Sequence, residues 1–185
     1  MSEQNKKFIN SFVWVSIIAF VIRCILSKDT SFVEFSAYDL WGYAGESISF
    51  ATIIMTLYEK IFWKFNPLEK TPVLKRKYKG TFISTYDGIE REAILEIKQT
   101  LLSVSIIFTS GESKSKSITA SVDKVLDEWQ LTYCYLNVPQ ANVRERSVIH
   151  YGTAMLCVDN SEELIGQYFS DRKTTGDMKF YAENV

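Results

Sequence analysis

Apolar residues are distributed unevenly along this chain. Long apolar runs fill the first 65 residues, and a period-two alternation of apolar and polar residues follows them. The first run extends from Phe8 to Leu26 and contains one charge, Arg23. A helix of about 19 residues at ~1.5 Å per residue matches a hydrocarbon core of about 30 Å. We therefore predict a first transmembrane helix, because the apolar core of a cleaved signal peptide is shorter.

The second run extends from Leu40 to Trp63 and is less apolar than the first. Aromatic side chains stand at both of its ends, as interfacial anchors do in membrane helices. These aromatic residues are Trp41, Tyr43, Tyr58 and Trp63. We predict a second transmembrane helix here, and hence a two-helix hairpin over residues 1–65.

Cations flank the predicted hairpin, whereas the segment between its two runs is acidic. Lys6 and Lys7 precede the first run, and residues 27–39 contain one lysine and several acids. Six cations follow the second run: Lys64, Lys70, Lys75, Arg76, Lys77 and Lys79. The positive-inside bias then predicts a multi-pass protein with both termini in the cytoplasm.

Glu46 is a carboxylate within the second run, and such a group is costly near lipid unless it is neutralised, partnered or wetted. Three explanations are open. Glu46 lies shallow at the outer interface, or it pairs with Arg23 within or between subunits, or it becomes buried or wetted only when hairpins assemble. Gly42, Gly45 and Ser49 permit the close helix approach that the last explanation needs.

After the hairpin, Pro67 and Pro72 end the helical pattern, and residues 66–77 form a basic linker. The alternation that follows predicts about eight strands over residues 78–185, with turns at Asp87–Gly88, 110–112 and 159–161. The predicted strands are Tyr78–Tyr86, Glu92–Gln99, Leu101–Ser110, Lys116–Lys124, Glu128–Val138, Ser147–Val158, Leu164–Ser170 and Met178–Ala182.

The connections between these strands are too short for crossover helices, so the strands are mostly antiparallel. Closure removes exposed edges, and we predict an up-and-down β-barrel, with a β-sandwich as the alternative. Strand parity places two sets of residues on the inner face. They are Tyr78, Gly80 and Phe82, and Trp129, Leu131, Tyr133 and Tyr135. A barrel of about eight strands fills itself with side chains or holds one small ligand.

The composition of the chain argues against several classes of function. Lys and Arg total 21 against 22 Asp and Glu, so no strongly basic field favours a nucleic-acid polymer. The chain has one histidine, His150, no paired-cysteine motif, and none of the phosphate-loop, zinc-protease or nucleophile-elbow motifs. We predict no enzyme, no metal site and no cofactor. The three cysteines, Cys24, Cys134 and Cys157, suit buried thiols in a reducing compartment.

A polar stretch interrupts the last strands, over residues 166–178. A guanidinium, an ammonium and two hydroxyls beside an aromatic ring suit phosphate and base contacts, although a solvated hairpin has the same composition. The candidate ligand contacts in this stretch are Tyr168, Arg172, Lys173, Thr174 and Thr175. We predict that Arg172 is the main residue that binds a phosphate and that the Tyr168 ring stacks on a base.

Two further residues are candidate ligand contacts. His150 stands at the start of a predicted strand, where a structural role is the alternative, and Tyr135 shares the inward face with Trp129. Serines alternate with lysines over residues 113–117, and we interpret this segment as a solvated edge strand protected by its lysines.

The order of these features resembles a bacterial defence family. Its motifs here are YKGTF (78–82), LTYCYLNVP (131–139), HYGTAML (150–156) and GQYFSDRKTTGDM (166–178). Behind two apolar runs and a basic linker, they resemble the two-transmembrane, β-strand-rich effectors of cyclic-oligonucleotide-based antiphage signalling (CBASS). The resemblance covers essentially the whole chain.

The resemblance implies a β-barrel receptor for a cyclic dinucleotide that a partner nucleotidyltransferase makes after phage infection. In that family, ligand binding promotes homo-oligomerisation, and the membrane helices disrupt the bacterial inner membrane and kill the infected cell. Clustered hairpins would bring Arg23 and Glu46 together, where wetting costs less. The alternative is a membrane-tethered barrel that binds a lipid or serves as an adaptor, since small barrels also suit apolar ligands.

Overall fold

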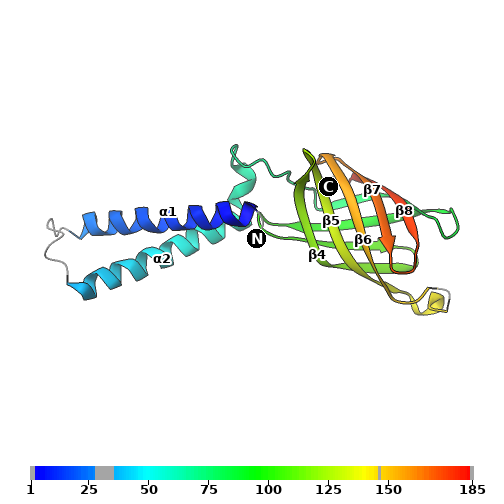
Figure 1. The fold of residues 1–185 in the computed structure, drawn as a ribbon, viewed down its shortest axis with the longest axis horizontal. Coiled ribbons are helices and arrows are strands. Elements are labelled where there is room, and N and C mark those ends of the chain that lie inside the picture. Colours follow the sequence, from blue (N-terminus) through cyan, green and yellow to red (C-terminus); the bar gives the residue numbers. More distant parts are fainter. Residues whose placement is uncertain (1–2, 28–35, 146, 184–185) are drawn as a thin grey trace. The chain divides into compact units, whose positions relative to one another are not determined.

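The computed structural model describes residues 3–27, 36–145 and 147–183, and its contacts divide the chain into two compact units, Met1–Asn66 and Pro67–Val185. The first unit contains helices α1 (Glu3–Leu26) and α2 (Ala37–Lys60) and a short 3-10 helix, η1 (Phe62–Phe65). The second contains eight strands and the 3-10 helix η2 (Ala141–Val143) (Figure 1). Most of the predicted acidic loop lies outside the described residues.

Helix α2 begins at a capping box and packs along α1. The Ser36 hydroxyl accepts a hydrogen bond from the Asp39 backbone N–H, and the Asp39 carboxylate accepts one from the Ser36 N–H. Ser47, Ala51 and Met55 recur every four residues on one face of α2 and are buried. The small side chains of Ser47 and Ala51 let the two helices approach closely.

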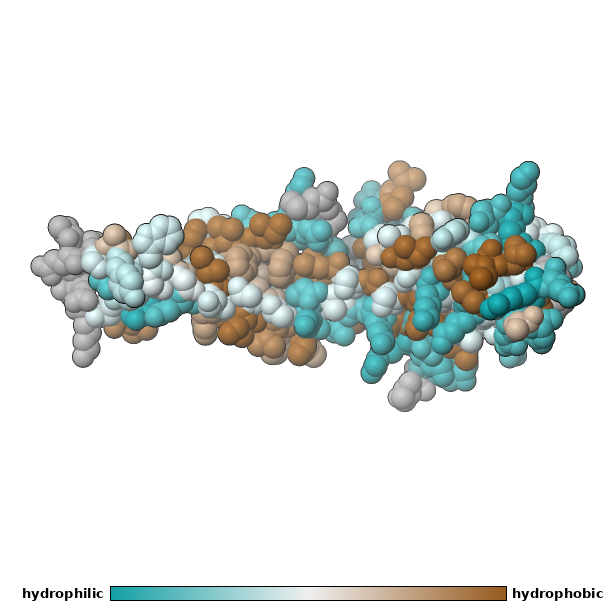
Figure 2. Space-filling view, turned by 90° about the horizontal axis from the view of Figure 1, so that it is seen from below, coloured by the Kyte–Doolittle hydropathy of each residue, from teal (hydrophilic) through white to brown (hydrophobic). Residues whose placement is uncertain are grey.

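One helix of the described residues is long and apolar enough to cross a membrane, and it is α1, over Gln4–Leu26. Figure 2 shows apolar side chains over the middle of the visible face of the helical unit. The predicted second span, and with it the multi-pass topology, is not supported. Asp39 and Glu46 occupy the first half of α2, and the apolar stretch from Ile48 to Leu57 is about half of the ~20 residues that a span needs. The aromatic ends of this run had suggested a longer apolar stretch.

The second unit is a closed antiparallel barrel in the order β1 to β8, with β8 paired to β1. This confirms the predicted up-and-down barrel over the sandwich. The strands are β1 (Lys77–Ser84), β2 (Glu90–Gln99), β3 (Val104–Ser110), β4 (Ser113–Val125), β5 (Glu128–Pro139), β6 (His150–Asn160), β7 (Glu163–Ser170) and β8 (Thr175–Ala182). Strand β4 pairs with both β3 and β5, so the prediction of an edge strand over 113–117 is wrong.

The strand ends differ from the predicted ones where turns are tight. The third strand begins at Val104 rather than 101, because the Thr100 N–H donates to the Ser103 carbonyl oxygen and forms a turn. The last strand begins at Thr175, earlier than predicted, because Lys173 adopts a left-handed backbone conformation (φ 60°) that closes the preceding turn in few residues.

The inner face follows the predicted parity. Buried apolar side chains alternate along the strands and fill one half of the barrel, including Tyr78, Leu95, Leu131, Leu156, Leu164 and Phe180. The Tyr78 hydroxyl closes this end, since it donates to the Ser161 carbonyl oxygen at 2.8 Å and accepts from the Lys75 N–H at 2.9 Å. We refer to this closed, apolar end as the floor of the barrel.

Only one of the three cysteines in the described residues is buried, so the prediction of three buried thiols is wrong. Cys24 is buried in the helical unit, whereas Cys134 is exposed and Cys157 is partly exposed. Cys134 stands between Tyr133 and Tyr135, which face inward, and strand alternation therefore turns its thiol outward.

Candidate functional site

The end of the barrel opposite the floor opens into a cavity of about 170 Å³. We call this end the mouth. Its side chains come from all eight strands, from the turns between them and from the segment after β5. The cavity is lined by Phe82, Ser84, Tyr86, Asp87, Arg91, Phe108, Ser110, Glu112, Ser113, Ser115, Tyr133, Tyr135, Asn137, Val143, Ser147, His150, Tyr168, Arg172, Thr174 and Met178.

Two glycines make room for aromatic rings along the wall of the mouth. Gly152 pairs with Tyr135 across β5 and β6, and a Cβ at Gly152 would come 2.3 Å from the tyrosine hydroxyl. Gly176 pairs with Tyr168 across β7 and β8, and a Cβ there would come 2.5 Å from that ring. The rings thus lie over the glycines, and the centre of the cavity stays open.

The aromatic side chains contact one another around the lower part of the cavity. Phe82 meets Phe108 edge-on at 5.4 Å between centroids and Tyr168 at 6.3 Å. Tyr133 and Tyr135 lie 5.8 Å apart. Burial raises the pKa of both of these phenols, so they stay neutral and can donate hydrogen bonds. The arrangement offers ring faces and edges to a planar ligand group.

Arg172 reaches the cavity from the turn between β7 and β8. Its Nη1 donates to the Ser147 hydroxyl at 3.0 Å. The turn is fixed by the Ser170 N–H, which donates to the Thr174 carbonyl oxygen at 2.9 Å, and by a 2.7 Å contact between their hydroxyls. The side chain of Arg172 is half-buried, which strengthens its attraction for an anion relative to a fully solvated guanidinium.

The structure brings most of the predicted ligand residues to this cavity. These are Tyr135, His150, Tyr168, Arg172 and Thr174. Lys173 and Thr175 are exposed and do not line the cavity. Lys173 lies in the turn that its left-handed backbone closes, and Thr175 begins β8 with the parity opposite to that of the buried Gly176 and Met178. The predicted contacts from these two residues are therefore not supported by their placement.

His150 is oriented by its neighbour in the chain. Its Nδ1 lies 2.9 Å from the Val148 carbonyl oxygen, which only accepts, so Nδ1 carries the proton in this contact. The second ring nitrogen, Nε2, makes no hydrogen bond within the described part of the chain, and His150 lines the cavity. The ring is thus held by the backbone and offers one nitrogen for recognition.

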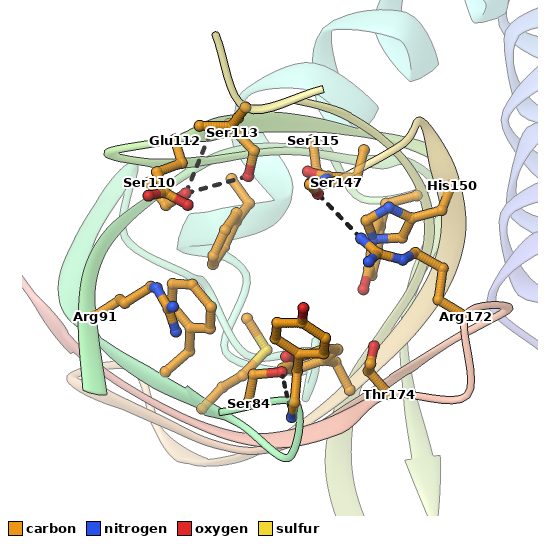
Figure 3. Close-up of a pocket in the computed structure, with 18 of the residues that line it drawn as sticks. Ser84, Arg91, Ser110, Glu112, Ser113, Ser115, Ser147, His150, Arg172 and Thr174 are labelled. Atoms are coloured by element: carbon orange, nitrogen blue, oxygen red, sulfur yellow. Dashed lines mark hydrogen bonds between the residues drawn. The ribbon is translucent and has the colours of Figure 1, made fainter. Parts of the chain in front are cut away.

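Arg91 lies across the opening from Arg172 and was missed by the sequence analysis (Figure 3). Its guanidinium forms two hydrogen bonds with the Asp87 carboxylate, one of them at 3.0 Å, and these bonds lower the pKa of Asp87 to about 2. The sequence did contain a signal for Arg91, because this residue shares strand parity with Ala93 and Leu95, which face inward. The predicted strand began one residue too late to include it.

Ser115 and Asn137 form a buried polar pair that the sequence analysis also missed. The Ser115 hydroxyl donates to Asn137 Oδ1 at 2.7 Å, and the two residues are direct register partners on β4 and β5. Ser115 had been placed on a solvated edge strand. Asn137 follows Tyr133 and Tyr135 in inward parity, which is the signal that could have found it.

The helical unit contains the other predicted contact. Arg23 Nε lies 2.6 Å from Glu46 Oε2, and the Arg23 guanidinium lies 4.3 Å from the Tyr43 ring centroid. The structure therefore pairs Arg23 with Glu46 within one chain. In the described parts of the chain, no three His, Cys, Asp or Glu side chains are arranged to hold a metal ion.

Comparison with known proteins places the barrel in a family. Residues 69–181 match the Cap15 cyclic dinucleotide receptor domain, a range that contains every residue lining the cavity. The chain belongs to this Cap15 family. It is also 30% identical over 184 residues to CD-NTase-associated protein 15 of Staphylococcus schleiferi, and the match covers 97% of each chain. The likeness to this Cap15 relative thus includes α1 and α2 as well as the barrel, and it confirms the resemblance to CBASS effectors.

Proposed function

We propose that this chain is a membrane-anchored receptor of antiphage defence that binds a cyclic dinucleotide in the mouth of its barrel. Its family is one of cyclic dinucleotide receptors rather than of enzymes, and its relative is a CD-NTase-associated protein. Ligand binding then promotes homo-oligomerisation, and the assembled helical units disrupt the bacterial inner membrane. The result is the death of the infected cell.

The observation that carries the proposal is the pair of arginines on opposite sides of the mouth. A cyclic dinucleotide has two phosphodiester groups on opposite sides of one macrocycle, and Arg91 and Arg172 face one cavity from opposite sides. Guanidinium groups bind phosphate oxygens with charge-assisted hydrogen bonds. Arg91 is already held by Asp87, so its fork is oriented before the ligand arrives.

The aromatic wall supplies the base contacts. Tyr168 and Tyr135 present rings along the wall, and a base stacked on an aromatic ring contributes about 1–3 kcal/mol in nucleic-acid complexes. The cavity of about 170 Å³ is smaller than the ~300–1,000 Å³ of typical ligand pockets. A cyclic dinucleotide therefore lies across the mouth, with its bases directed inward and part of its ring exposed.

Exposure of the bound ligand suggests how it controls assembly. A ligand shifts an equilibrium only if it binds one state more tightly than the other. A ligand surface left outside one barrel can contact a second chain, so the assembled state gains contacts that the separate chain lacks. This provides the preference that ligand-promoted oligomerisation requires.

The membrane step is assigned to the helical unit. Helix α1 anchors the chain in the membrane, because large apolar side chains are exposed along it from Ile9 to Leu26. Assembly concentrates the anchors and the Arg23–Glu46 pairs that they carry. Grouped charges attract water, and water near lipid opens a route for ions.

A lipid-binding or adaptor barrel is the competing function. The lower cavity is apolar, with Phe82, Phe108 and Met178, which an acyl chain would also suit. The mouth is polar instead, with two arginines and several serines, and these groups favour an anionic, hydrogen-bonding ligand. The polar mouth is the reason for preferring the nucleotide.

The test is a titration of the full chain in detergent micelles with cyclic dinucleotides and, separately, with a fatty acid. We expect saturable binding of at least one cyclic dinucleotide, a raised unfolding temperature by mass action, and larger particles in light scattering. A response to the fatty acid with none to any cyclic dinucleotide would favour the lipid carrier. Binding without growth in particle size would retain the receptor and reject assembly.

A further inference from the structure

Asn137 is a buried amide in the wall of the mouth. Asn137 is 7% exposed, and its hydrogen-bond partner Ser115 is 4% exposed. The hydroxyl-bearing rings of Tyr133 and Tyr135 are also buried, whereas the remaining polar residues that line the cavity are more exposed. An amide removed from water is costly unless its donors and acceptors are paired, so the contacts of Asn137 decide what the wall can bind.

The oxygen end of the Asn137 amide already has a hydrogen-bond partner. The Ser115 hydroxyl donates to Oδ1 at 2.7 Å, whereas Nδ2 donates to no group among the residues that the structure describes. An asparagine has two N–H donors on Nδ2 and two lone pairs on Oδ1. The serine therefore fixes the orientation of the amide and leaves its donor end for the cavity that Asn137 lines.

Arginine contacts alone cannot distinguish one cyclic dinucleotide from another. The phosphodiester groups are identical whatever the bases are, and phosphate contacts position a nucleotide without reading its sequence. Bases are distinguished by donors and acceptors at their edges. Asn137 shares the inward parity of Tyr135 on β5, and in its observed orientation it offers both donors of Nδ2, whereas Ser115 takes one of the two lone pairs of Oδ1.

We propose that Asn137 is the residue that selects the base, with Nδ2 donating to a carbonyl oxygen at the base edge. The inference rests on the proposed function, that a cyclic dinucleotide binds in the mouth. A carbonyl edge occurs in uracil and guanine, whereas adenine presents an amino group at the corresponding position. Adenine usually pairs with both ends of an asparagine amide, and Ser115 already takes one of the two lone pairs of Oδ1, which leaves this end less suited to the adenine amino group. The mouth therefore prefers a ligand with at least one uracil or guanine.

The experiment measures the affinities of the full chain in detergent for cyclic di-UMP, cyclic di-GMP and cyclic di-AMP by calorimetry. We expect one of the first two to bind at least tenfold more tightly than cyclic di-AMP. Asn137→Ala should reduce this ratio to within threefold. Asn137→Asp, which has the same shape and replaces the donor by an acceptor, should shift the ratio toward cyclic di-AMP.

Two further variants separate the possible failures. Arg172→Gln should weaken the binding of all ligands by a similar factor and leave the ratio unchanged. Ser115→Ala, which frees the amide to rotate, should narrow the ratio without abolishing binding. Unfolding temperatures establish that each variant is folded.

The outcomes are distinguishable. Equal affinities for the three ligands in the unmodified chain, or an unchanged ratio in both Asn137 variants, would overturn the role of Asn137 and leave the receptor intact. Failure of every cyclic dinucleotide to bind the unmodified chain would overturn the proposed function itself, and the base preference with it.

Discussion

The two ends of the barrel are built from the same eight strands and differ in what their inner positions carry. At the floor, the inward residues are apolar and fully buried, as at Leu131 and Phe180. At the mouth, the same alternation turns Arg91, Ser115 and Asn137 inward. The floor therefore holds the buried apolar core, and the mouth holds the polar groups that we propose for ligand recognition. This division predicts that stability and ligand binding can be damaged separately.

The largest effect is expected at the floor. Phe180→Ala removes a fully buried ring that packs edge-on against Phe108 at 6.2 Å between centroids. Such a truncation costs about 3–5 kcal/mol of unfolding free energy. Denaturant titration measures it.

The matched control is Phe169→Ala on β7, whose ring is 46% exposed and faces outward. Its unfolding free energy should change by less than about 0.5 kcal/mol. An equal loss in both variants would break the distinction between the filled interior and the outer face.

The mouth should show the opposite behaviour. Arg172→Ala removes a charge-assisted contact of about 1.5–3 kcal/mol and should weaken cyclic dinucleotide binding roughly tenfold to hundredfold, with little change in stability. Arg91→Ala should act similarly, and the double variant should lose detectable binding. Calorimetry measures the affinities.

Lys173→Ala provides the control for charge alone. Lys173 is the neighbour of Arg172 in the chain but is exposed and does not line the cavity. Its removal should weaken binding less than about threefold, as expected for a screened surface charge. Unchanged affinity in a folded Arg172→Ala variant would eliminate Arg172 as a phosphate ligand.

A smaller effect is expected where the wall of the mouth is shaped by glycine. Gly152→Ala places a Cβ 2.3 Å from the Tyr135 hydroxyl, so the ring must move into the cavity. Overpacking of this kind costs about 1–3 kcal/mol, and we expect binding to weaken together with stability. Gly111→Ala is the control, because nothing lies within 4 Å of its added Cβ. Equal affinities in the two variants would contradict the role of Gly152.

The smallest effect is expected for the Asp87–Arg91 pair and concerns how stability changes at acidic pH. The hydrogen bond from Arg91 lowers the pKa of Asp87 to about 2, below its usual value of 3.8. The folded state therefore binds the proton less readily than the unfolded chain, and the contribution of this pair is present above about pH 4 and lost as pH falls through about 2.

Asp87→Asn should accordingly lower stability slightly at pH 7, where the ion pair contributes, and its difference from the unmodified chain should disappear as pH falls through about 2. Thermal unfolding between pH 2 and 7 measures both. A large loss at pH 7 would show that the mouth contributes to closure of the barrel, against the division between its two ends.

Much of the barrel was predictable because its alternation and its turns point the same way. The Asp87–Gly88 turn, for example, has the left-handed glycine (φ 67°) that its sequence suggests. The Leu126–Asp127 turn was less visible, since both residues adopt positive φ without a glycine. Closure itself followed from the need to pair every strand edge.

The candidate site was predictable in part, where its residues form a recognisable stretch of the sequence. Tyr168 and Arg172 belong to a polar stretch that stands out from its surroundings. Arg91 and Asn137 are polar residues at inward positions whose neighbours of the same parity are mostly apolar or aromatic, and such positions acquire meaning only when neighbouring strands are aligned. The predicted second span is not supported, because its aromatic ends were given more weight than two acids, Asp39 just before the run and Glu46 within it.

The most direct test of the account is a structure of the full chain with a bound cyclic dinucleotide. We predict that its two phosphodiester groups lie within hydrogen-bond distance of Arg91 and Arg172, with a base against Tyr168. A ligand bound on the outer surface, such as the shallow groove beside Tyr151 and Phe169, would contradict the assignment of the mouth as the receptor site.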